Sequence, residues 1–198
     1  MLLKFESIEN ILPIDGKVNY YGKIYSDTIS MKLFDKLISE INLENDEVIV
    51  FGKKYRMNRK TAWFSSDNKT YKYSNAIKIS QNWTPTLIEI KNKIEEIVGE
   101  KFNACLINYY SDGNDGMGWH ADNEKEIIEN SSIASFSLGE QRTFKIRHTN
   151  SKITKTIQLE NGSLLLMKDE TQKYWQHCIT KSKKIHNSRI NLTFRKIY

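Results

Sequence analysis

The chain has 198 residues, which is enough for one sizeable hydrophobic core and too few for two independent ones. It carries 30 Lys and Arg against 24 Asp and Glu, so its net charge of +6 suits a polyanionic partner without identifying one. The N-terminus lacks a long apolar stretch, and no segment approaches the roughly 18 apolar residues of a membrane-spanning helix, so we expect neither a secretion signal nor a membrane anchor.

Two amphipathic helices are predicted in the first half of the chain. Asp27 can cap the first, whose apolar residues follow a 3.6-residue period over residues 29–41. Thr84 can cap the second, a proline suits its first turn, and Gly99 can end it. Each helix should pack its apolar face against a sheet.

Short strands dominate the prediction for the second half. These segments are rich in β-branched and aromatic residues, and they span residues 102–110, 132–138, 142–147, 153–159, 163–167 and 189–196. Asn161-Gly162 is expected to turn a tight hairpin between two of them. Helices followed by many short strands indicate a single α+β domain built on a two-sheet jelly roll or a similar barrel.

The two cysteines indicate the redox environment. Cys105 and Cys178 are far apart in sequence, and each lies in an apolar run, which favours reduced core residues over a disulfide. We therefore expect an intracellular protein, found in the nucleus of a eukaryotic host and otherwise in the cytoplasm.

His120-Ala121-Asp122 is a candidate metal site. Residues two apart on an extended segment project to the same face, so His120 and Asp122 can reach one ion. His177 can supply a third ligand from a distant strand. Two imidazoles and one carboxylate can hold Fe(II) on one face and leave the opposite positions open for an organic acid and O2.

The same three residues have plainer explanations. In a chain with four histidines, a His-x-Asp arises by chance in roughly one case in five. His120 would then be a solvent-exposed loop residue, and His177 a core histidine beside Trp175. A zinc hydrolase also uses two histidines and a carboxylate, but it leaves the paired arginines that follow His177 unexplained.

These arginines, Arg189 and Arg195, lie in one strand-like run. Being six positions apart, they face the same side of a regular strand and can serve opposite ends of one small dianion. A 2-oxoacid with a distal carboxylate needs such a cation, and guanidinium binds carboxylate in a bidentate way. Asn108 and Tyr110 lie on an apolar strand before a Gly-rich turn and can join this pocket. The alternative for the arginines is an ordinary basic edge strand.

Five motifs carry a further indication. They are Leu106-Ile107-Asn108-Tyr109-Tyr110, His120-Ala121-Asp122-Asn123-Glu124, Ile133-Ala134-Ser135-Phe136-Ser137-Leu138-Gly139, Gly162-Ser163-Leu164-Leu165-Leu166-Met167 and Arg189-Ile190-Asn191-Leu192-Thr193-Phe194-Arg195. Together they resemble the AlkB family of Fe(II)/2-oxoglutarate-dependent nucleic-acid demethylases, and its duplex-DNA-repair branch in particular. The resemblance runs from about Phe51 to the C-terminus, and the last motif is highly specific for the family.

The resemblance implies a fold and a set of ligands. The fold is a double-stranded β-helix, a cupin-like jelly roll, with N-terminal helices packed on the sheet. Fe(II) would be bound by His120, Asp122 and His177. The implied 2-oxoglutarate residues are Asn108, Tyr110, Arg189, Asn191, Thr193 and Arg195. Arg189 would pair with the distal carboxylate and Arg195 with the end that chelates iron, and these two roles could be exchanged.

The activity that the resemblance implies is oxidative demethylation. 2-Oxoglutarate and O2 are consumed, and a methyl group on N1-methyladenine or N3-methylcytosine in DNA is hydroxylated and released as formaldehyde. That methyl group lies on the Watson–Crick edge, so the nucleotide must be flipped out of the duplex. Methylated DNA is therefore the expected partner of a monomeric enzyme. RNA is the alternative substrate, and a non-catalytic nucleic-acid-binding module is a third reading.

Residues 48–80 are expected to recognise the nucleotide, between an N-terminal helical extension over residues 1–47 and a catalytic part over residues 81–198. Val50-Phe51-Gly52 resembles the hydrophobic finger that fills the gap left by a flipped base. The basic residues that follow are expected to contact phosphates: Lys53, Lys54, Arg56, Arg59 and Lys60. Val50 and Phe51 are otherwise ordinary strand residues.

Stacking and charge complete the expected base site. Tyr71 and Tyr73 lie in a segment that resembles the family's stacking aromatic, although Tyr73 could also pack on a strand surface. Asn123 and Glu124 follow the metal-ligand motif, where the duplex branch usually has a second acidic residue directly after the iron-binding Asp. Because the methylated bases are cations, Asn123 removes one charge that would select them, which puts substrate preference in question.

Overall fold

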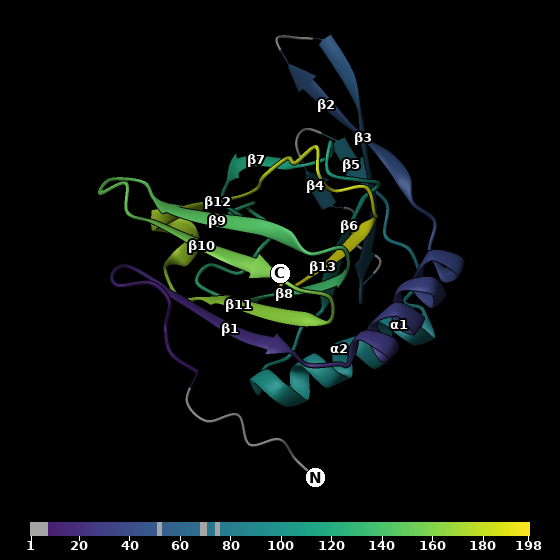
Figure 1. Ribbon diagram of the computed structural model, residues 1–198, viewed down its shortest axis with the longest axis horizontal. Coiled ribbons are helices and arrows are strands. Elements are labelled where there is room, and N and C mark those ends of the chain that lie inside the picture. Colours follow the sequence, from purple (N-terminus) through teal and green to yellow (C-terminus); the bar gives the residue numbers. More distant parts are fainter. Residues whose placement is uncertain (1–7, 51–52, 68–70, 74–75) are drawn as a thin grey trace.

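Two antiparallel sheets face each other (Figure 1). The computed structural model describes residues 8–50, 53–67, 71–73 and 76–198. The larger sheet has seven strands in the order β1 (Lys17–Lys23), β11 (Ser163–Lys168), β8 (Ile133–Gly139), β13 (Arg189–Arg195), β6 (Ala104–Tyr110), β3 (Lys53–Ser65) and β2 (Glu44–Val50). The smaller sheet has four, in the order β10 (Thr154–Leu159), β9 (Arg142–His148), β12 (Trp175–Ile179) and β7 (Met117–His120).

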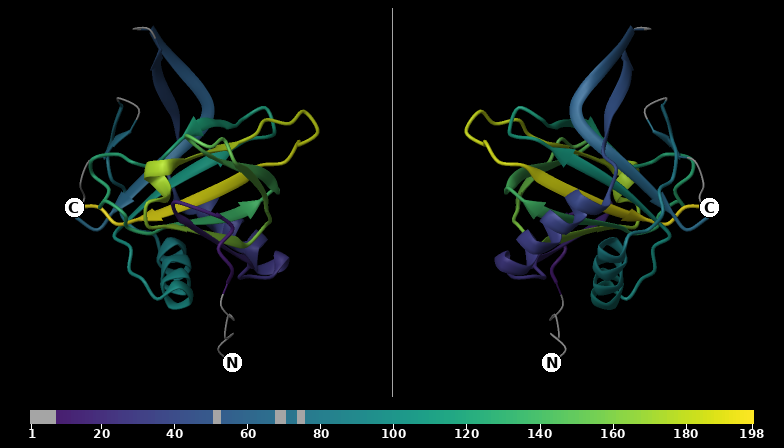
Figure 2. Two further views of the ribbon diagram at one scale, coloured as in Figure 1. Left: turned by 90° about the vertical axis from the view of Figure 1, so that its left-hand side faces the viewer. Right: turned by 90° about the vertical axis from the view of Figure 1, so that its right-hand side faces the viewer.

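Helices cover the outer face of the larger sheet (Figure 2). α1 (Asp27–Glu40) and α2 (Pro85–Val98) bury apolar residues such as Leu37 and Ile90 against it. A third, short helix is α3 (Thr171–Tyr174), and a separate two-stranded ribbon joins β4 (Tyr71–Tyr73) to β5 (Ala76–Lys78). The α+β jelly roll predicted from the sequence is therefore confirmed.

The helix boundaries follow from capping. Thr84 accepts a hydrogen bond from the backbone N–H of Leu87, and Gly99 ends α2 with a φ of 72°, as predicted. The predicted cap of α1 was wrong by one residue, because Ser26 accepts the N–H of Ile29. Asp27 instead stands in the first turn, where a carboxylate interacts favourably with the helix dipole.

The prediction of a hairpin at Asn161-Gly162 was wrong. The preceding strand β10 pairs only with β9, whereas β11 pairs with β8 and β1, so the turn carries the chain from one sheet to the other. Gly162 has a φ of 76°, which explains the glycine. The side chain of Asn161 accepts a hydrogen bond from the backbone N–H of Gly139 and fixes the turn to the larger sheet.

Seven of the described strands lie outside the predicted segments: β1 to β5, β7 and β12. β7 begins in the segment read as a Gly-rich turn, and β12 carries His177. β1 lies in the part expected to be a helical extension, and it pairs with β11. Thr171 in α3 fastens β1 further, because its hydroxyl accepts the N–H of Lys17 at 2.9 Å and donates to the carbonyl of the same residue.

The core has a part on each side of the larger sheet. The part between the sheets includes Val18, Leu165, Phe144 and Ile146, and the opposite part joins the sheet to α1 and α2. Cys105 and Cys178 are both free thiols and buried. None of the helices that the structure describes has the length and apolar character needed to cross a bilayer.

Candidate metal centre

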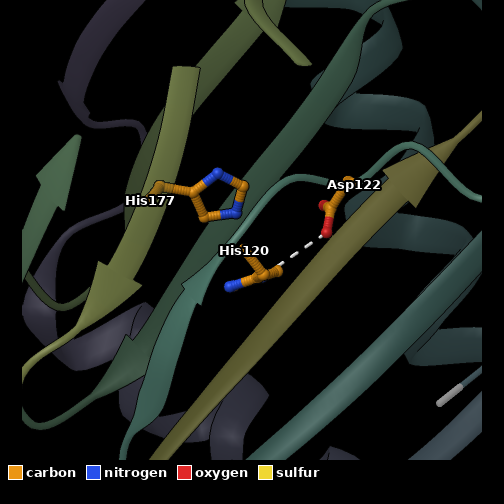
Figure 3. Close-up of side chains that lie close together, drawn as sticks. All are labelled: His120, Asp122 and His177. Carbon is orange, nitrogen blue, oxygen red and sulfur yellow. Dashed lines mark ion pairs between the residues drawn. The ribbon is translucent and has the colours of Figure 1, made fainter. Parts of the chain in front are cut away.

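His120, Asp122 and His177 converge between the two sheets (Figure 3). His120 ends β7 and pairs in register with His177 of β12, and Asp122 follows two residues after the strand. One ligand atom from each residue lies within 4.8 Å of the other two. Nε2 of His120 is 3.5 Å from Oδ1 of Asp122. The strand pairing thus brings together residues that are 57 positions apart in the chain.

The ring of His120 is oriented by its own strand. Its Nδ1 lies 2.8 Å from the carbonyl oxygen of Gly118, which can only accept, so Nδ1–H is the donor. In the neutral ring the lone pair then resides on Nε2, the nitrogen that faces Asp122. A backbone carbonyl commonly fixes the tautomer of a metal-binding histidine in this way.

His177 is held neutral by its surroundings. It is buried and stacks on Phe144 at 5.3 Å between ring centroids. Burial first, and then the nearby charge of His120, lower the pKa of His177 to about 3. The imidazole therefore keeps a lone pair for a metal at neutral pH, and its Nδ1 has no hydrogen-bond partner among the described residues.

Asp122 stays ionised although it is buried. Burial alone would raise the pKa of this carboxyl group, but the nearby charge of Arg195 outweighs burial and holds the pKa below its usual value. Arg195 lies 2.9 Å from Oδ2 and is itself buried, so the pair is shielded from solvent. Oδ1 remains directed toward His120 (Figure 3).

Gln172 positions the backbone of Asp122, a role that no sequence motif indicated. Its Oε1 accepts the N–H of Asp122 at 2.8 Å, and its Nε2 donates to the sulfur of Met167. Gln172 lies on α3 directly after Thr171, the residue that fastens β1. The amide therefore links the ligand loop to the edge of the larger sheet.

Replacing Gln172 with alanine should weaken metal binding about tenfold, because groups that orient a ligand typically contribute 10- to 100-fold to affinity. Titration with Co(II), followed by its absorption, measures this. Lys173→Ala removes an exposed neighbour on the same helix and serves as the control. Equal affinity of the Gln172→Ala variant and the unsubstituted protein would contradict the role.

The donor set fits iron. Two neutral imidazoles and one ionised carboxylate on one side of a cavity are the ligands of non-haem Fe(II) oxygenases, which leave the remaining positions for co-substrates. The three ligands need no rearrangement of strands to meet, since their atoms already lie close together.

A cavity extends from the metal ligands between the sheets. Five of the six residues expected to bind the co-substrate line it: Asn108, Tyr110, Asn191, Thr193 and Arg195. Oδ1 of Asn108 is buried and has no hydrogen-bond partner among the described residues. Apolar side chains complete the walls: Leu106, Met117, Phe144, Met167 and Ile179. A small acid bound here would be largely removed from water.

Arg189 lies behind this cavity. It is fully buried, and its guanidinium is 5.3 Å from the ring centroid of Tyr110, a residue of the cavity wall. Nη2 donates to Ser137, but Nε and Nη1 are buried without hydrogen-bond partners in the described part of the chain. Burial first lowers the pKa of Arg189, to about 10, and the charge of Arg142 contributes. These unsatisfied donors fit a carboxylate ligand.

No sequence motif pointed to Arg142 as a residue of the site. It is 5.5 Å from the ring centroid of the same tyrosine, Tyr110, and donates to the carbonyls of Asp112, Asp115 and Thr180. Two buried guanidinium groups thus adjoin one aromatic ring. Only the alternation of β9 could have indicated that Arg142 faces inward, because the residues two and four positions later are core residues.

One predicted phosphate contact was wrong. Arg59 is buried, lines the cavity and lies 2.6 Å from the sulfur of Met117, so it does not face solvent. Phe51 and Gly52 lie outside the described residues, and so do the side chains of Val50, Tyr71 and Tyr73. Their proposed contacts with the nucleotide remain predictions.

Asn123 and Glu124 adjoin the metal centre on its outer side. Both line a groove of about 480 Å³, whose other lining residues include Asp122, Gln172 and Tyr198. Glu124 lies 3.8 Å from Arg195, while Asn123 is exposed. The expected contacts of these two residues with a base remain predictions.

Comparison with known proteins agrees with this geometry. The sequence pattern of the 2OG-Fe(II) oxygenase superfamily matches residues 17–195. The chain is 35% identical over 188 residues to DNA oxidative demethylase ALKBH2 of Mus musculus, covering 89% of this chain and 77% of that protein. It is 37% identical over 154 residues to alpha-ketoglutarate-dependent dioxygenase alkB homolog 3 of Rattus norvegicus, covering 73% of this chain and 52% of that protein.

Among solved structures, that of OsALKBH1 matches with a TM-score of 0.63. The match covers 93% of this chain and 98% of that chain at 14% sequence identity. At this identity the likeness concerns the fold, and it agrees with two facing antiparallel sheets.

Proposed function

Because this chain belongs to the AlkB family of 2OG-Fe(II) oxygenases, we propose that it is an oxidative demethylase that repairs alkylated DNA. The substrates we infer are N1-methyladenine and N3-methylcytosine, with the base flipped from the duplex. The observation that carries the proposal is the acidic groove that shares the metal ligand Asp122 with the cavity of the metal centre, since a base bound in it would lie next to that ligand.

The charge of this groove favours a cationic ligand. Four of its residues carry carboxylates and two are lysines: Asp122, Glu124, Glu129 and Asp169 against Lys125 and Lys173. N1-methyladenine and N3-methylcytosine carry a positive charge, whereas the unmodified bases are neutral. Nearby carboxylates therefore select the damaged base by electrostatic attraction.

Each part of the site has a task in this reaction. Bound iron, with 2-oxoglutarate and O2, supplies the oxidising power that hydroxylates the methyl carbon and yields succinate and CO2. His120, Asp122 and His177 would hold the metal, and Arg195 keeps Asp122 ionised. The hydroxylated product then releases formaldehyde and leaves the repaired base.

The cavity residues fix the co-substrate. We assign the distal carboxylate of 2-oxoglutarate to Arg189, whose buried Nε and Nη1 lack partners among the described residues. Arg142 adds a second positive charge next to Tyr110. The apolar walls exclude water, which strengthens these interactions and holds the acid in one orientation.

The deciding experiment mixes iron-loaded protein, 2-oxoglutarate and air with three matched oligonucleotides. N1-methyladenine is placed in duplex DNA, single-stranded DNA or RNA, and the repaired base, formaldehyde and succinate are measured. We expect repair in DNA, with none by a His177→Ala control. A preference for RNA would mean that the enzyme carries out the same chemistry on RNA rather than on DNA. No demethylation by protein that still binds Fe(II) would refute the proposal.

Restoring the missing carboxylate should sharpen selectivity. In Asn123→Asp, a charge at about 4 Å in water contributes roughly 1 kcal/mol, so the preference for cationic over neutral methylated bases should rise about fivefold. The measurement is the ratio of kcat/KM for N1-methyladenine to that for N3-methylthymine. Asn130→Asp adds the same charge at an exposed position elsewhere in the groove and is the matched control. An unchanged ratio would mean that Asn123 does not face the base.

A further inference from the structure

Trp119 is a large aromatic residue on the outside of the metal-binding sheet. Its side chain is 38% exposed, although it directly precedes the ligand His120. The guanidinium of Arg147 lies over its ring, 4.3 Å from the centroid. Within the described part of the chain, Arg147 has no carboxylate partner. Trp119 is thus an exposed ring beside a half-buried cation that lies over one of its faces.

The sheet around this pair is basic. Lys145 and Arg147 project outward from β9, because Phe144 and Ile146 point into the core between the sheets. The outward residues of β9, β10 and β12, all within the described part of the chain, include these two cations and no acid: Thr143, Lys145, Arg147, Thr154, Thr156, Gln158, Gln176 and Cys178. This face therefore attracts a polyanion.

The position of β7 relates this face to the iron site. β7 is the edge strand of the smaller sheet, so one of its two long edges is not paired with another strand of that sheet. Successive residues of a strand project to opposite faces, and His120 points inward while Trp119 points outward. Asp122, which lines the groove proposed for the flipped base, follows β7 by two residues, so the substrate strand would pass close to this edge.

We propose that Trp119 and Arg147 form a platform that stacks an unmodified nucleotide close to the flipped one in the substrate strand. This inference rests on the proposed function, because it assumes a nucleic-acid substrate. A base stacks on the indole, and Arg147 contacts the adjoining phosphate while Lys145 adds positive charge. Such stacking accepts any base, so the platform contributes affinity without sequence preference.

The chemistry of the pair favours this partner over a protein. A protein interface that buries a tryptophan usually surrounds it with apolar residues, whereas the outward neighbours here are threonine, glutamine, lysine and arginine. An aromatic ring among cations and hydroxyl groups matches a base joined to phosphates.

The experiment measures binding of an unmodified single-stranded oligonucleotide to the full chain loaded with Mn(II) and 2-oxoglutarate under argon. Fluorescence anisotropy gives the Kd at several salt concentrations. Trp119→Ala should raise the Kd about fivefold to a hundredfold, and Trp119→Phe should recover most of the affinity. Arg147→Gln should lower the slope of log Kd against log salt by about 0.7. Lys36→Gln removes a cation from exposed α1 on the far side and controls for net charge.

Three outcomes of this binding experiment decide whether Trp119 and Arg147 form a stacking platform. The expected loss in Trp119→Ala with recovery in Trp119→Phe supports the platform. A Kd that is the same for the unsubstituted protein and both Trp119 variants overturns it. A Kd raised equally by Trp119→Ala and Trp119→Phe also overturns it, since stacking needs only an aromatic ring. Mn(II) affinity, measured in parallel, identifies any damage to His120. Binding that depends on Trp119 without demethylation would refute the proposed function alone.

Discussion

Replacing His177 with alanine should abolish iron binding and 2-oxoglutarate turnover. His177 supplies one of three protein ligands and is held neutral by burial, so no other described side chain can take its place without moving a strand. Because residues that merely orient a ligand contribute 10- to 100-fold, loss of the ligand itself should lower Fe(II) affinity by more than about 100-fold. Anaerobic titration with Fe(II) measures the affinity, and succinate formation measures turnover.

His186→Ala is the matched control for this substitution. It removes an imidazole that is exposed and outside the metal centre. Circular dichroism and thermal unfolding then verify that the His177→Ala protein is folded. A folded variant that still binds Fe(II) with the original affinity would show that His177 is a core residue rather than a ligand.

Replacing Arg189 with methionine should raise the KM for 2-oxoglutarate by at least about 30-fold. A buried charge that pairs with a ligand carboxylate typically contributes 2–5 kcal/mol. Metal affinity should stay close to normal, because Arg189 contacts Tyr110 and Ser137 rather than the metal ligands. Titration with 2-oxoglutarate in the presence of Mn(II) measures binding without turnover.

The melting temperature distinguishes a role of Arg189 in binding 2-oxoglutarate from a role in packing. In the free protein the guanidinium of Arg189 is fully buried next to Arg142, so its removal should leave the melting temperature unchanged or raise it. 2-Oxoglutarate should stabilise the unsubstituted protein but not Arg189→Met. A lowered melting temperature together with an unchanged KM would assign Arg189 to packing alone.

Much of the site could be predicted from the sequence because the residues that mark it lie close together in the chain. His120 and Asp122 are two residues apart on extended chain, which places them on one side wherever the strand goes. Thr84 and Gly99 mark α2 for a similar reason, since capping depends on neighbouring backbone groups. The arginines of β13 were found through a motif that is contiguous in the chain.

What was missed depends on contacts between distant segments. Arg142 and Gln172 meet their partners only after the two sheets close, so no spacing in the sequence indicates their roles. Arg59 looked like a surface cation among other basic residues, but strand β3 turns it into the cavity. The turn at Asn161-Gly162 has the composition of a hairpin, and only the pairing of the flanking strands shows that it changes sheets.

The attachment of the first strand has a consequence for how the protein folds. The bond between Lys17 and Thr171 closes a loop of 154 residues, and Thr171 adjoins the Gln172 amide that holds Asp122. Contacts between residues so far apart in sequence form late, because the entropy lost on closing the loop must be offset by structure already present. We therefore expect β1 to dock late, and the carboxylate ligand gains its full support only when β1 and α3 have met.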